Sequence, residues 1–292
     1  MKRIAKGILT FLLLSNIIFA ADFSVGITTK YFQKKYGELR LSTDISKDDF
    51  YSKGEILIDN KSETIINKLY SEFYIGDITL SLGRQNIDWG SSYFFNYGNV
   101  FNNINWENPK EQGKGVDSLY VKYIKGLSRL EMVLFQKEKE NENLGIRYTK
   151  TILNSELMVN YFRNYGKEKD ELLLEFKGNL ILGIWGQYLV KNKFFNVGAD
   201  YSIDIFDNVL YLLTEYEYKL DSNNKKTFNM YRYNLSENAY FSQTLIYDFE
   251  NANYNWNADY SYIYNDYVTL DFIYKDDNLN NSEYGVKMDV EF

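Results

Sequence analysis

Apolar and polar residues alternate in short segments along almost the whole chain, and this period of two decides the fold class. The clearest segment is 254–264, where aromatic residues and one alanine occupy the even positions, while Asn, Asp and Ser occupy most of the odd ones. Successive side chains of a strand point to opposite faces, so each such segment forms a strand with one apolar face. Pro109 is the only proline, so the segments keep their N–H donors for a sheet. The sequence therefore predicts an all-β fold.

Eighteen segments of this kind follow one another, most of them close to the roughly 9–11 residues that a tilted transmembrane strand needs. The segments 53–59 and 77–85 are the weakest, and sixteen strands result if two weak segments merge. We expect strands at 22–31, 36–45, 53–59, 67–75, 77–85, 115–125, 127–137, 143–152, 154–164, 170–177, 180–190, 194–203, 208–219, 227–235, 239–248, 254–264, 266–275 and 283–292.

The connections between these strands favour a membrane barrel over a soluble β-sandwich. If the first strand rises from the periplasm, even-to-odd connections lie inside the cell envelope, and they include the very short turns at Gly76, Gly126 and Leu153. Most of the longer, more charged connections are odd-to-even, as expected for external loops. A secreted soluble β-protein has no reason to sort its loops by parity. We therefore predict a transmembrane antiparallel up-and-down β-barrel.

The last strand carries a motif of its own. Glu283, Gly285, Met288 and Val290 are spaced as polar, glycine, apolar and apolar, and Phe292 follows. This segment resembles the closing strand of Gram-negative outer-membrane β-barrels, in which the pattern is read by the barrel assembly machinery. The resemblance implies that Gly285, Met288, Val290 and Phe292 act as an assembly signal. It also implies the outer membrane of a Gram-negative-type cell as the location, with membrane lipid as a partner.

Residues 1–20 read as a secretory signal peptide, with Lys2, Arg3 and Lys6 before an apolar stretch. An uncleaved membrane anchor is the rival interpretation, although the apolar stretch is short for a full span. Residues 21–292 then form the barrel. Removing three positive charges takes the formal charge from -7 to -10. Nucleic acid is excluded as a partner because phosphate binding needs a basic surface.

The chain contains neither cysteine nor histidine, which excludes whole classes of chemistry. Disulfides, thiolate metal sites, histidine-ligated metals and histidine-based hydrolases are impossible. An outer-membrane enzyme would need a Ser-Lys or carboxylate pair, and no compact motif of that kind is present. We therefore expect no enzyme activity, no cofactor and no metal.

An eighteen-stranded barrel is too wide for its own side chains to fill, so it leaves an aqueous channel. Strand parity assigns seventeen acidic and ten basic residues to this interior, which predicts mild cation selectivity. The alternative is a wall of ion pairs with no effect on transport. The acidic residues are Glu38, Asp44, Glu55, Asp59, Glu72, Glu131, Glu156, Glu171, Glu175, Asp200, Glu215, Glu217, Asp248, Asp259, Asp271, Asp289 and Glu291; the basic ones are Lys30, Arg40, Lys122, Arg129, Arg147, Lys177, Lys219, Arg232, Lys275 and Lys287. Within these sets we assign the pore lining to Arg40, Glu72, Lys122, Arg129, Glu131, Arg147, Asp200, Arg232, Asp259 and Asp271.

The long connection 86–114, the third external loop by this count, is rich in aromatic residues and exceeds ordinary loop length. In the general porins that this sequence resembles, the third loop folds into the channel and narrows it. The resemblance implies a constriction formed by Asp88, Trp89, Trp106, Glu107, Lys110 and Glu111. The two tryptophans either stack on sugar rings or pin the loop to the wall.

The edges of this loop carry a second resemblance. The runs Gly83-Arg84-Gln85, Asp88-Trp89-Gly90 and 114–117 look like a segment of porins of the alginate-export type. The usual proline-aspartate element is absent from it. Parity also points Arg84 toward lipid, which a bulge at Gly83 or a position above the hydrocarbon would resolve.

These observations predict a passive outer-membrane channel for small hydrophilic solutes or ions. The alternative is a structural or adhesin barrel without an open pore. A large plug domain and periplasmic assembly modules have no room in the chain. The sequence leaves both a monomer and a trimer open.

Overall fold

The computed structural model describes residues 22–32, 36–59, 64–101, 115–136, 142–164, 169–179, 181–206, 208–222, 224–265, 268–277 and 282–291. Within these ranges the side chains of residues 22–40, 57, 59, 142, 164, 169, 265, 283, 287 and 289–291 are not described. The predicted signal peptide 1–20 and Phe292 lie outside the described residues.

The described part of the chain consists of strands joined by turns and by one long segment. The strands are β1 (Asp22–Phe32), β2 (Tyr36–Lys47), β3 (Phe50–Asp59), β4 (Thr64–Ile75), β5 (Ile78–Gln85), β6 (Val116–Lys125), β7 (Ser128–Gln136), β8 (Glu142–Ile152), β9 (Ser155–Asn164), β10 (Lys169–Asn179), β11 (Gly183–Leu189), β12 (Phe194–Ile205), β13 (Asn208–Lys219), β14 (Asn224–Ser236), β15 (Ala239–Asp248), β16 (Asn253–Asn265), β17 (Val268–Asp277) and β18 (Ser282–Glu291).

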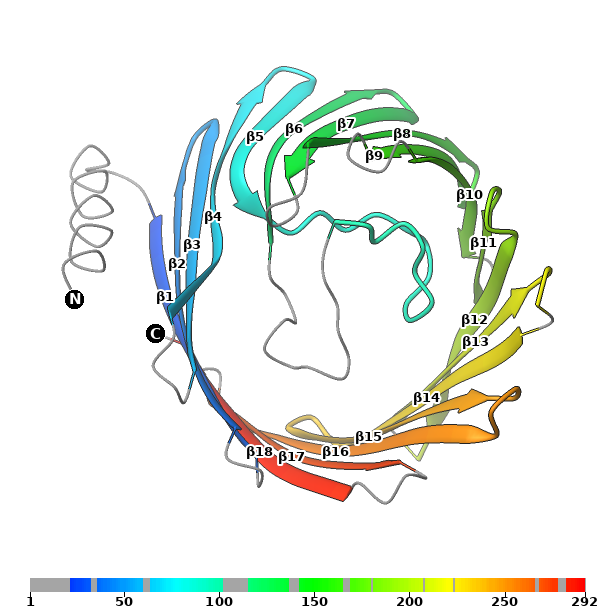
Figure 1. Cartoon of the computed structure of the whole chain (residues 1–292). Helices are drawn as coiled ribbons and strands as arrows, with labels where there is room; N and C mark the ends of the chain where they lie inside the picture. Colours follow the sequence, from blue (N-terminus) through cyan, green and yellow to red (C-terminus); the bar gives the residue numbers. More distant parts are fainter. Residues whose placement is uncertain are drawn as a thin grey trace.

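Every strand pairs antiparallel with the next one along the chain. β1 also pairs with β18, with Gly26 opposite Glu291 and Phe32 opposite Gly285. Figure 1 shows the strands arranged in a ring around an interior space. The all-β, antiparallel, up-and-down arrangement predicted from the sequence is confirmed.

The tight turns lie where the short connections were expected. Gly76 and Gly126 each have φ of 56°, a left-handed conformation that glycine adopts without strain, and Leu153 adopts φ of 53° in the equivalent turn. Gly83 lies in regular register with Tyr70 and Ser118, so the bulge suggested for this position is absent. The irregularity of this region lies instead between Glu55 and Ile56 on β3.

Arg84 is stabilised on the outer side of the sheet by an ion pair. It lies directly opposite Asp117 of β6, and its Nε and Nη2 atoms donate to the two carboxylate oxygens at 2.9 and 2.6 Å. Its Nη1 atom also donates to the carbonyl of Ile66 at 3.1 Å. This bidentate pair at the end of β5 accounts for a charged residue at an outward position.

The outer face of the ring is apolar, and β7 shows the pattern most simply. Leu130, Met132 and Leu134 are exposed, whereas Glu131, Val133 and Phe135 between them are buried. Exposed leucine, valine, phenylalanine and tyrosine continue this face on most other strands. Such a surface suits hydrocarbon rather than water. No helix among the described residues is long and apolar enough to span a membrane, a finding that does not bear on crossing by strands.

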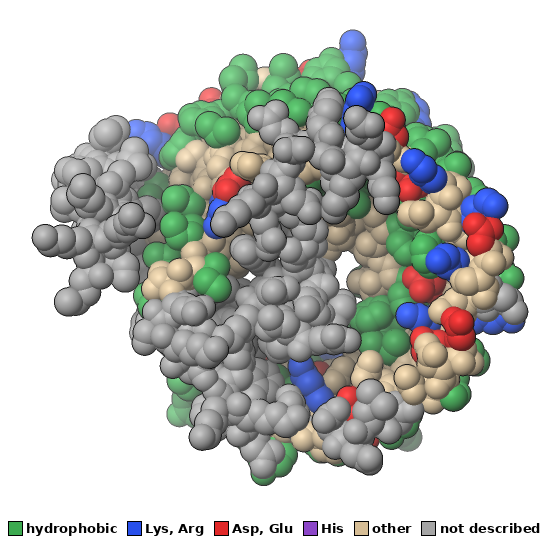
Figure 2. Space-filling model, viewed as in Figure 1, with side chains coloured by type: hydrophobic (Ala, Val, Ile, Leu, Met, Phe, Trp, Pro, Cys, Tyr) green, Lys and Arg blue, Asp and Glu red, His purple; other side chains and the backbone are tan. Residues whose placement is uncertain are grey.

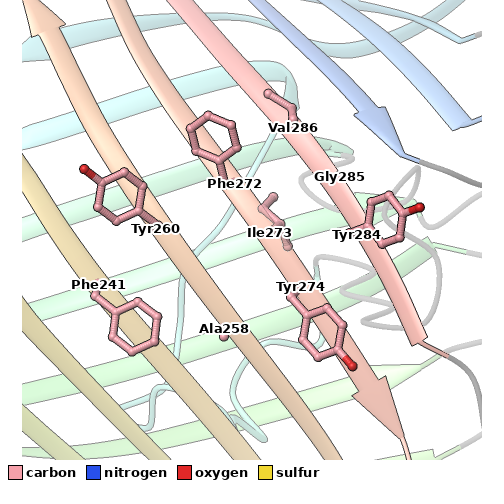
Figure 3. A pocket seen from close by; sticks show the side chains of 9 residues that line it. All are labelled: Phe241, Ala258, Tyr260, Phe272, Ile273, Tyr274, Tyr284, Gly285 and Val286. Atoms are coloured by element: carbon pink, nitrogen blue, oxygen red, sulfur yellow. The ribbon is translucent and has the colours of Figure 1, made fainter.

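The outer face is hollowed at β15–β18, as Figure 3 shows. Exposed aromatic rings, among them Phe241, Tyr260 and Phe272, surround the small residue Ala258 there. The buried hydrophobic clusters lie on the other side of the wall. Both are built between the inner faces of strands and the segment that follows β5.

Candidate functional site

The candidate site is the segment 86–101, which we call the arm. It leaves β5 and lies inside the ring of strands, drawn in cyan in Figure 1. Its contacts run along the inner wall from β7 to β14, so it lines one side of the interior. The remainder of the connection, 102–114, lies outside the described residues.

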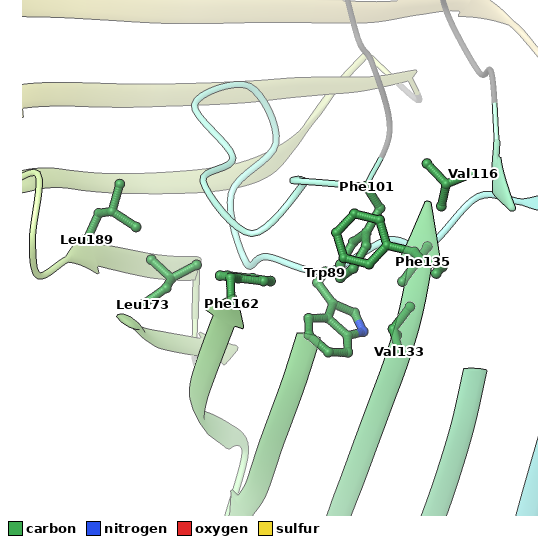
Figure 4. Packing of buried hydrophobic residues seen from close by; sticks show 9 residues of the cluster. Trp89, Phe101, Val116, Val133, Phe135, Phe162, Leu173 and Leu189 are labelled. Atoms are coloured by element: carbon green, nitrogen blue, oxygen red, sulfur yellow. The ribbon is translucent and has the colours of Figure 1, made fainter. Parts of the chain in front are cut away.

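The arm doubles back on itself, so that Trp89 and Phe101 meet at its near end, where aromatic packing fixes them against β7–β9. Trp89 is 1% exposed and Phe101 is 0% exposed, and their rings meet edge to face at 4.9 Å. Phe101 also contacts Phe135 at 4.8 Å, and Phe162 lies 5.8 Å from Trp89. Figure 4 shows these rings gathered at the ends of the strands. Burial of these two large aromatic side chains stabilises the near end of the arm against the wall.

Gly145 of β8 makes room for this packing. A Cβ atom at this position would lie 3.1 Å from both the Phe101 and the Trp89 rings. The glycine therefore allows the two arm rings to approach the backbone of the strand.

Glu215 of β13 anchors the far end of the arm. Its side chain is 0% exposed. Oε1 accepts hydrogen bonds from the backbone N–H of Tyr93 at 2.6 Å and from Trp185 Nε1 at 2.9 Å. Oε2 accepts from the backbone N–H of Phe94 at 3.1 Å and of Phe95 at 2.8 Å. Three successive N–H groups form an anion-binding nest, and here the anion is a side chain of the wall.

A row of polar side chains on neighbouring strands holds the middle of the arm. Glu175, Gln187 and Asn196 follow one another in register across β10, β11 and β12. Glu175 accepts from the N–H of Ser91 at 2.5 Å, and the side-chain oxygen of Gln187 accepts from the N–H of Tyr97 at 3.0 Å. Asn196 donates to the Ser92 hydroxyl and to the Phe95 carbonyl, both at 2.8 Å.

These contacts satisfy buried carboxylates without a cation. The donors to Glu175 and Glu215 are backbone N–H groups, the side-chain amides of Asn160 and Gln187, and the Trp185 indole. Hydrogen bonds replace the water that each buried carboxylate loses. Among the described residues no cation forms an ion pair with either carboxylate, although Lys177 Nζ lies 5.6 Å from the Tyr93 ring at the far end of the arm.

The arm also packs against β11–β14 through a second aromatic cluster. Phe94 stacks on Phe228 with ring centroids 4.5 Å apart, and Phe95 is buried beside Trp185 and Leu213. A Cβ atom on Gly198 would lie 2.3 Å from the Trp185 indole, so only glycine leaves room for this ring. The indole is thereby placed to donate to Glu215.

Tyr97 supplies the last anchor of the arm. Its hydroxyl donates to Glu217 Oε2 at 2.5 Å. Burial and this bond to a carboxylate raise the pKa of the Tyr97 hydroxyl above its ordinary value, so the hydroxyl stays protonated in neutral solution.

Asp88 is exposed. Trp89 is buried against the wall, so its ring packs there and is not open for a sugar to stack on. Trp106, Glu107, Lys110 and Glu111 lie outside the described residues. The structure therefore places only two of the six expected constriction residues. Tyr93, 52% exposed, lies at the far end of the arm, with its ring 5.0 Å from the ring of Trp185 and 5.6 Å from Lys177 Nζ.

The predicted pore-lining residues occupy both halves of the inner wall. Three of them form one group around Glu131: Arg129 Nε donates to its carboxylate at 2.9 Å, and Arg147 Nε lies 3.8 Å from the same carboxylate. Tyr120 also donates to Glu131. Lys122 of β6 lies opposite Glu131 of β7. Glu72 of β4 accepts a hydrogen bond from the hydroxyl of Tyr74.

The remaining members lie far from this group. Asp200 accepts from the Tyr211 hydroxyl at 2.6 Å, and Asp271 accepts from Ser261. Ser242 lies 3.5 Å from Asp259, and the Arg232 guanidinium lies 3.8 Å from the centre of the Tyr240 ring. The side chain of Arg40 is not described. The set therefore divides into separate groups rather than one ring of charge.

Sequence reasoning assigned Glu175, Glu215 and Glu217 to the interior but missed their role in holding the arm, and it missed Gln187 and Asn196 altogether. Their shared signal is register, since Glu175, Gln187, Asn196 and Glu217 form one continuous row across four strands. Register is invisible to a strand-by-strand reading. The described residues include no group of three or more acidic side chains placed to hold a metal ion.

Charged side chains of both signs also gather on the rim of the ring above β10–β13, as Figure 2 shows. Lys193 and Asp221 form an exposed ion pair there at 3.0 Å. Hydrophobic side chains follow the outer edge.

Solved structures match this fold over nearly the whole chain. Wzi of Escherichia coli, described as an outer membrane protein involved in group 1 capsule assembly and as a carbohydrate-binding β-barrel, matches with a TM-score of 0.69 at 14% identity, over 97% of this chain and 87% of Wzi. A mutant porin of Rhodopseudomonas blastica matches with a TM-score of 0.55 at 12% identity, over 94% of this chain and 100% of the porin. This chain has the fold of the porin-type outer-membrane β-barrels.

No protein-family model matches the barrel's sequence, and no curated protein does. At such low identity the likeness to Wzi and to the porin is one of fold alone. The arm and its anchors are therefore interpreted from this barrel's own residues.

Proposed function

We propose that this protein is an outer-membrane channel for passive diffusion of small hydrophilic solutes or ions, with an interior narrowed by the arm. In this proposal residues 1–20 direct export and are removed. Residues 21–292 form a membrane-spanning barrel of eighteen strands closed by the β1–β18 pairing. The apolar outer face and the porin-type fold support this placement.

The observation that carries the proposal is the arm, held inside the ring by Glu215 and by Trp89. A segment fixed along one side of the interior reduces the open cross-section. Solutes would then be selected by size and charge at the arm. Neither Wzi nor the porin is described as an enzyme.

Mild cation selectivity is part of the proposal. Many of the seventeen acidic side chains assigned to the interior are engaged in hydrogen bonds, but hydrogen bonds from neutral donors do not cancel charge. Glu175 and Glu215 therefore still favour cations near the arm.

Planar-bilayer recording of the purified protein tests the channel. We expect stepwise conductance. Under a salt gradient, we expect a reversal potential whose sign indicates preferential passage of cations. A barrel that inserts but carries no current would exclude passive diffusion. A reversal potential of the sign for anions would still support a passive channel, but it would contradict the proposed cation selectivity.

A second candidate is a carbohydrate-binding barrel without an open pore. Wzi, with its TM-score of 0.69, is described as carbohydrate-binding, and the exposed Tyr93 ring offers a surface on which a sugar can stack. Saccharide binding by the purified protein without conductance would favour this candidate. Replacing Tyr93 by Ala should then abolish binding.

A further inference from the structure

A hollow of about 310 Å³ lies on the inner wall at the border of the arm. It is lined by Val209 and Tyr211 of β13 and by Met230, Arg232 and Asn234 of β14. These residues alternate with outward positions in the same way as Glu215 and Phe228, the two wall residues that hold the arm. The hollow therefore opens to the interior of the ring, beside the arm residues Phe94 and Phe95, which belong to the same packed cluster as Tyr211 and Met230.

Three of the lining residues give the hollow a firm apolar side. Met230 and Tyr211 pack against the cluster that contains Phe95 and Phe228, so the anchored arm supports them from behind. The Tyr211 hydroxyl is already engaged, since it donates to Asp200 at 2.6 Å. Val209, Tyr211 and Met230 can thus receive an apolar group without rearrangement.

Arg232 gives the hollow its charge. The side chain is exposed to the interior, and its guanidinium lies 3.8 Å from the centre of the Tyr240 ring, where the cation is held against the aromatic face. Within the described chain, no carboxylate lies at ion-pair distance from Arg232. Arg129 and Arg147, by contrast, both lie within 4 Å of Glu131.

An oriented guanidinium without a counter-ion is suited to a carboxylate, which it binds through two parallel N–H···O bonds. The neighbouring Asn234 offers an amide for a further hydrogen bond. The volume is at the lower end of ligand pockets, roughly 300–1,000 Å³, so a small molecule fits and a polymer segment does not. Apolar walls beside one cation exclude simple inorganic anions as the best ligand.

We propose that this hollow binds a small organic acid, whose carboxylate pairs with Arg232 and whose apolar body lies against Val209, Tyr211 and Met230. The proposal rests on the proposed water-filled interior, through which a solute reaches the wall. A bound acid would lie next to the arm.

Calorimetric titration of the full-length protein in detergent micelles tests the site without requiring conductance. The probes are benzoate, its neutral analogue benzamide, and inorganic phosphate, each corrected with empty micelles. We expect saturable binding of benzoate, with benzamide and phosphate each about tenfold weaker or more, since each lacks the charge or the apolar body. Absence of saturable benzoate binding, or equal binding of phosphate, would overturn the proposal.

Two variants and a matched control locate the site. Arg232→Gln should weaken benzoate about tenfold or more, and Val209→Trp should do the same by filling the hollow without changing charge. Arg129→Gln removes the same charge from the distant β7 wall and should leave benzoate binding unchanged. Equal losses in Arg232→Gln and Arg129→Gln would mean that the general potential of the interior binds benzoate, and would overturn the assignment.

Heat-modified mobility in electrophoresis shows whether each variant is folded. Should Arg232→Gln fail this check, Val209→Trp still decides the matter. Conductance in the absence of benzoate is recorded separately. Benzoate binding without conductance would contradict the proposed channel, whereas conductance without benzoate binding would contradict only the binding site.

Discussion

Glu215 is a buried carboxylate whose four hydrogen-bond donors all carry no net charge. Both of its oxygens are used, each by two donors. A side chain with only one acceptor oxygen cannot replace it, because an amide NH2 group would face N–H groups. The arm therefore depends on the carboxylate itself and not on polarity in general.

Replacing Glu215 by Gln should release the far end of the arm. We expect larger conductance steps or more open-channel noise, since a lost hydrogen bond to a charged group costs about 1.5–3 kcal/mol. Single-channel recording measures the change. Glu156→Gln is the matched control, because Glu156 is an inward carboxylate opposite Lys177 with no bond to the arm. Identical traces for the two variants would contradict the anchoring role of Glu215.

The bond from Tyr97 to Glu217 makes the anchoring of the arm sensitive to high pH. The pKa of Tyr97 is raised above the ordinary value of about 10, first by burial and then by the bond to Glu217. A raised pKa stabilises the protonated, anchored form, so this contribution is fully present below pH 10 and is lost as the pH rises further.

We therefore expect channel noise in the wild type to increase above about pH 10. Tyr97→Phe has no proton to lose at this position. It should show the higher noise already at pH 8 and little further change up to pH 11. If the two proteins respond to alkali in the same way, titration of Tyr97 is not what loosens the arm.

At the scale of elements, the arm behaves as a separate unit fixed to a preformed wall. Its near end is held by burial of Trp89 and Phe101, and its far end by hydrogen bonds to Glu215. Apolar burial depends little on direction, whereas the hydrogen bonds require the register of β11–β13. Release of the near end should therefore free the arm more completely.

Phe101→Ala should expose the arm to protease. Truncating a buried phenylalanine costs about 3–5 kcal/mol, which here falls on the local contact rather than on the barrel. Limited proteolysis followed by mass spectrometry should show new cleavage between 86 and 101 while the strands stay intact. Phe206→Ala, at an exposed turn, should leave the wild-type pattern. Resistance of Phe101→Ala to cleavage would mean that the far anchors suffice.

The strands were predictable because alternation is a local property that each segment displays by itself. Residues 254–264 show it in sequence, and β16 spans Asn253–Asn265. The anchors were not predictable, because Glu175, Gln187 and Asn196 become neighbours only once the strands are in register. Trp89 was equally ambiguous, since an aromatic ring that packs on a wall and one that binds a sugar look the same in sequence.

At the scale of the whole molecule, the apolar outer face and the polar inner face are two sides of one sheet. A strand such as β7 contributes Met132 to the first and Glu131 to the second. If the outer face meets lipid, a charge introduced there must cost free energy according to its depth in the membrane. A charge near the end of the strand should cost much less.

Met132→Arg, at the middle of β7, tests this placement. We expect it to destabilise the barrel in lipid vesicles by about 2–4 kcal/mol, and Gln136→Arg, an outward residue at the end of the same strand, by about 0–1 kcal/mol. Urea-induced unfolding from vesicles, followed by tryptophan fluorescence, measures both. A soluble sheet would tolerate either arginine on its exposed face. Equal, small effects for the two variants would therefore argue against a membrane-embedded wall, and a graded loss would locate the hydrocarbon around Met132.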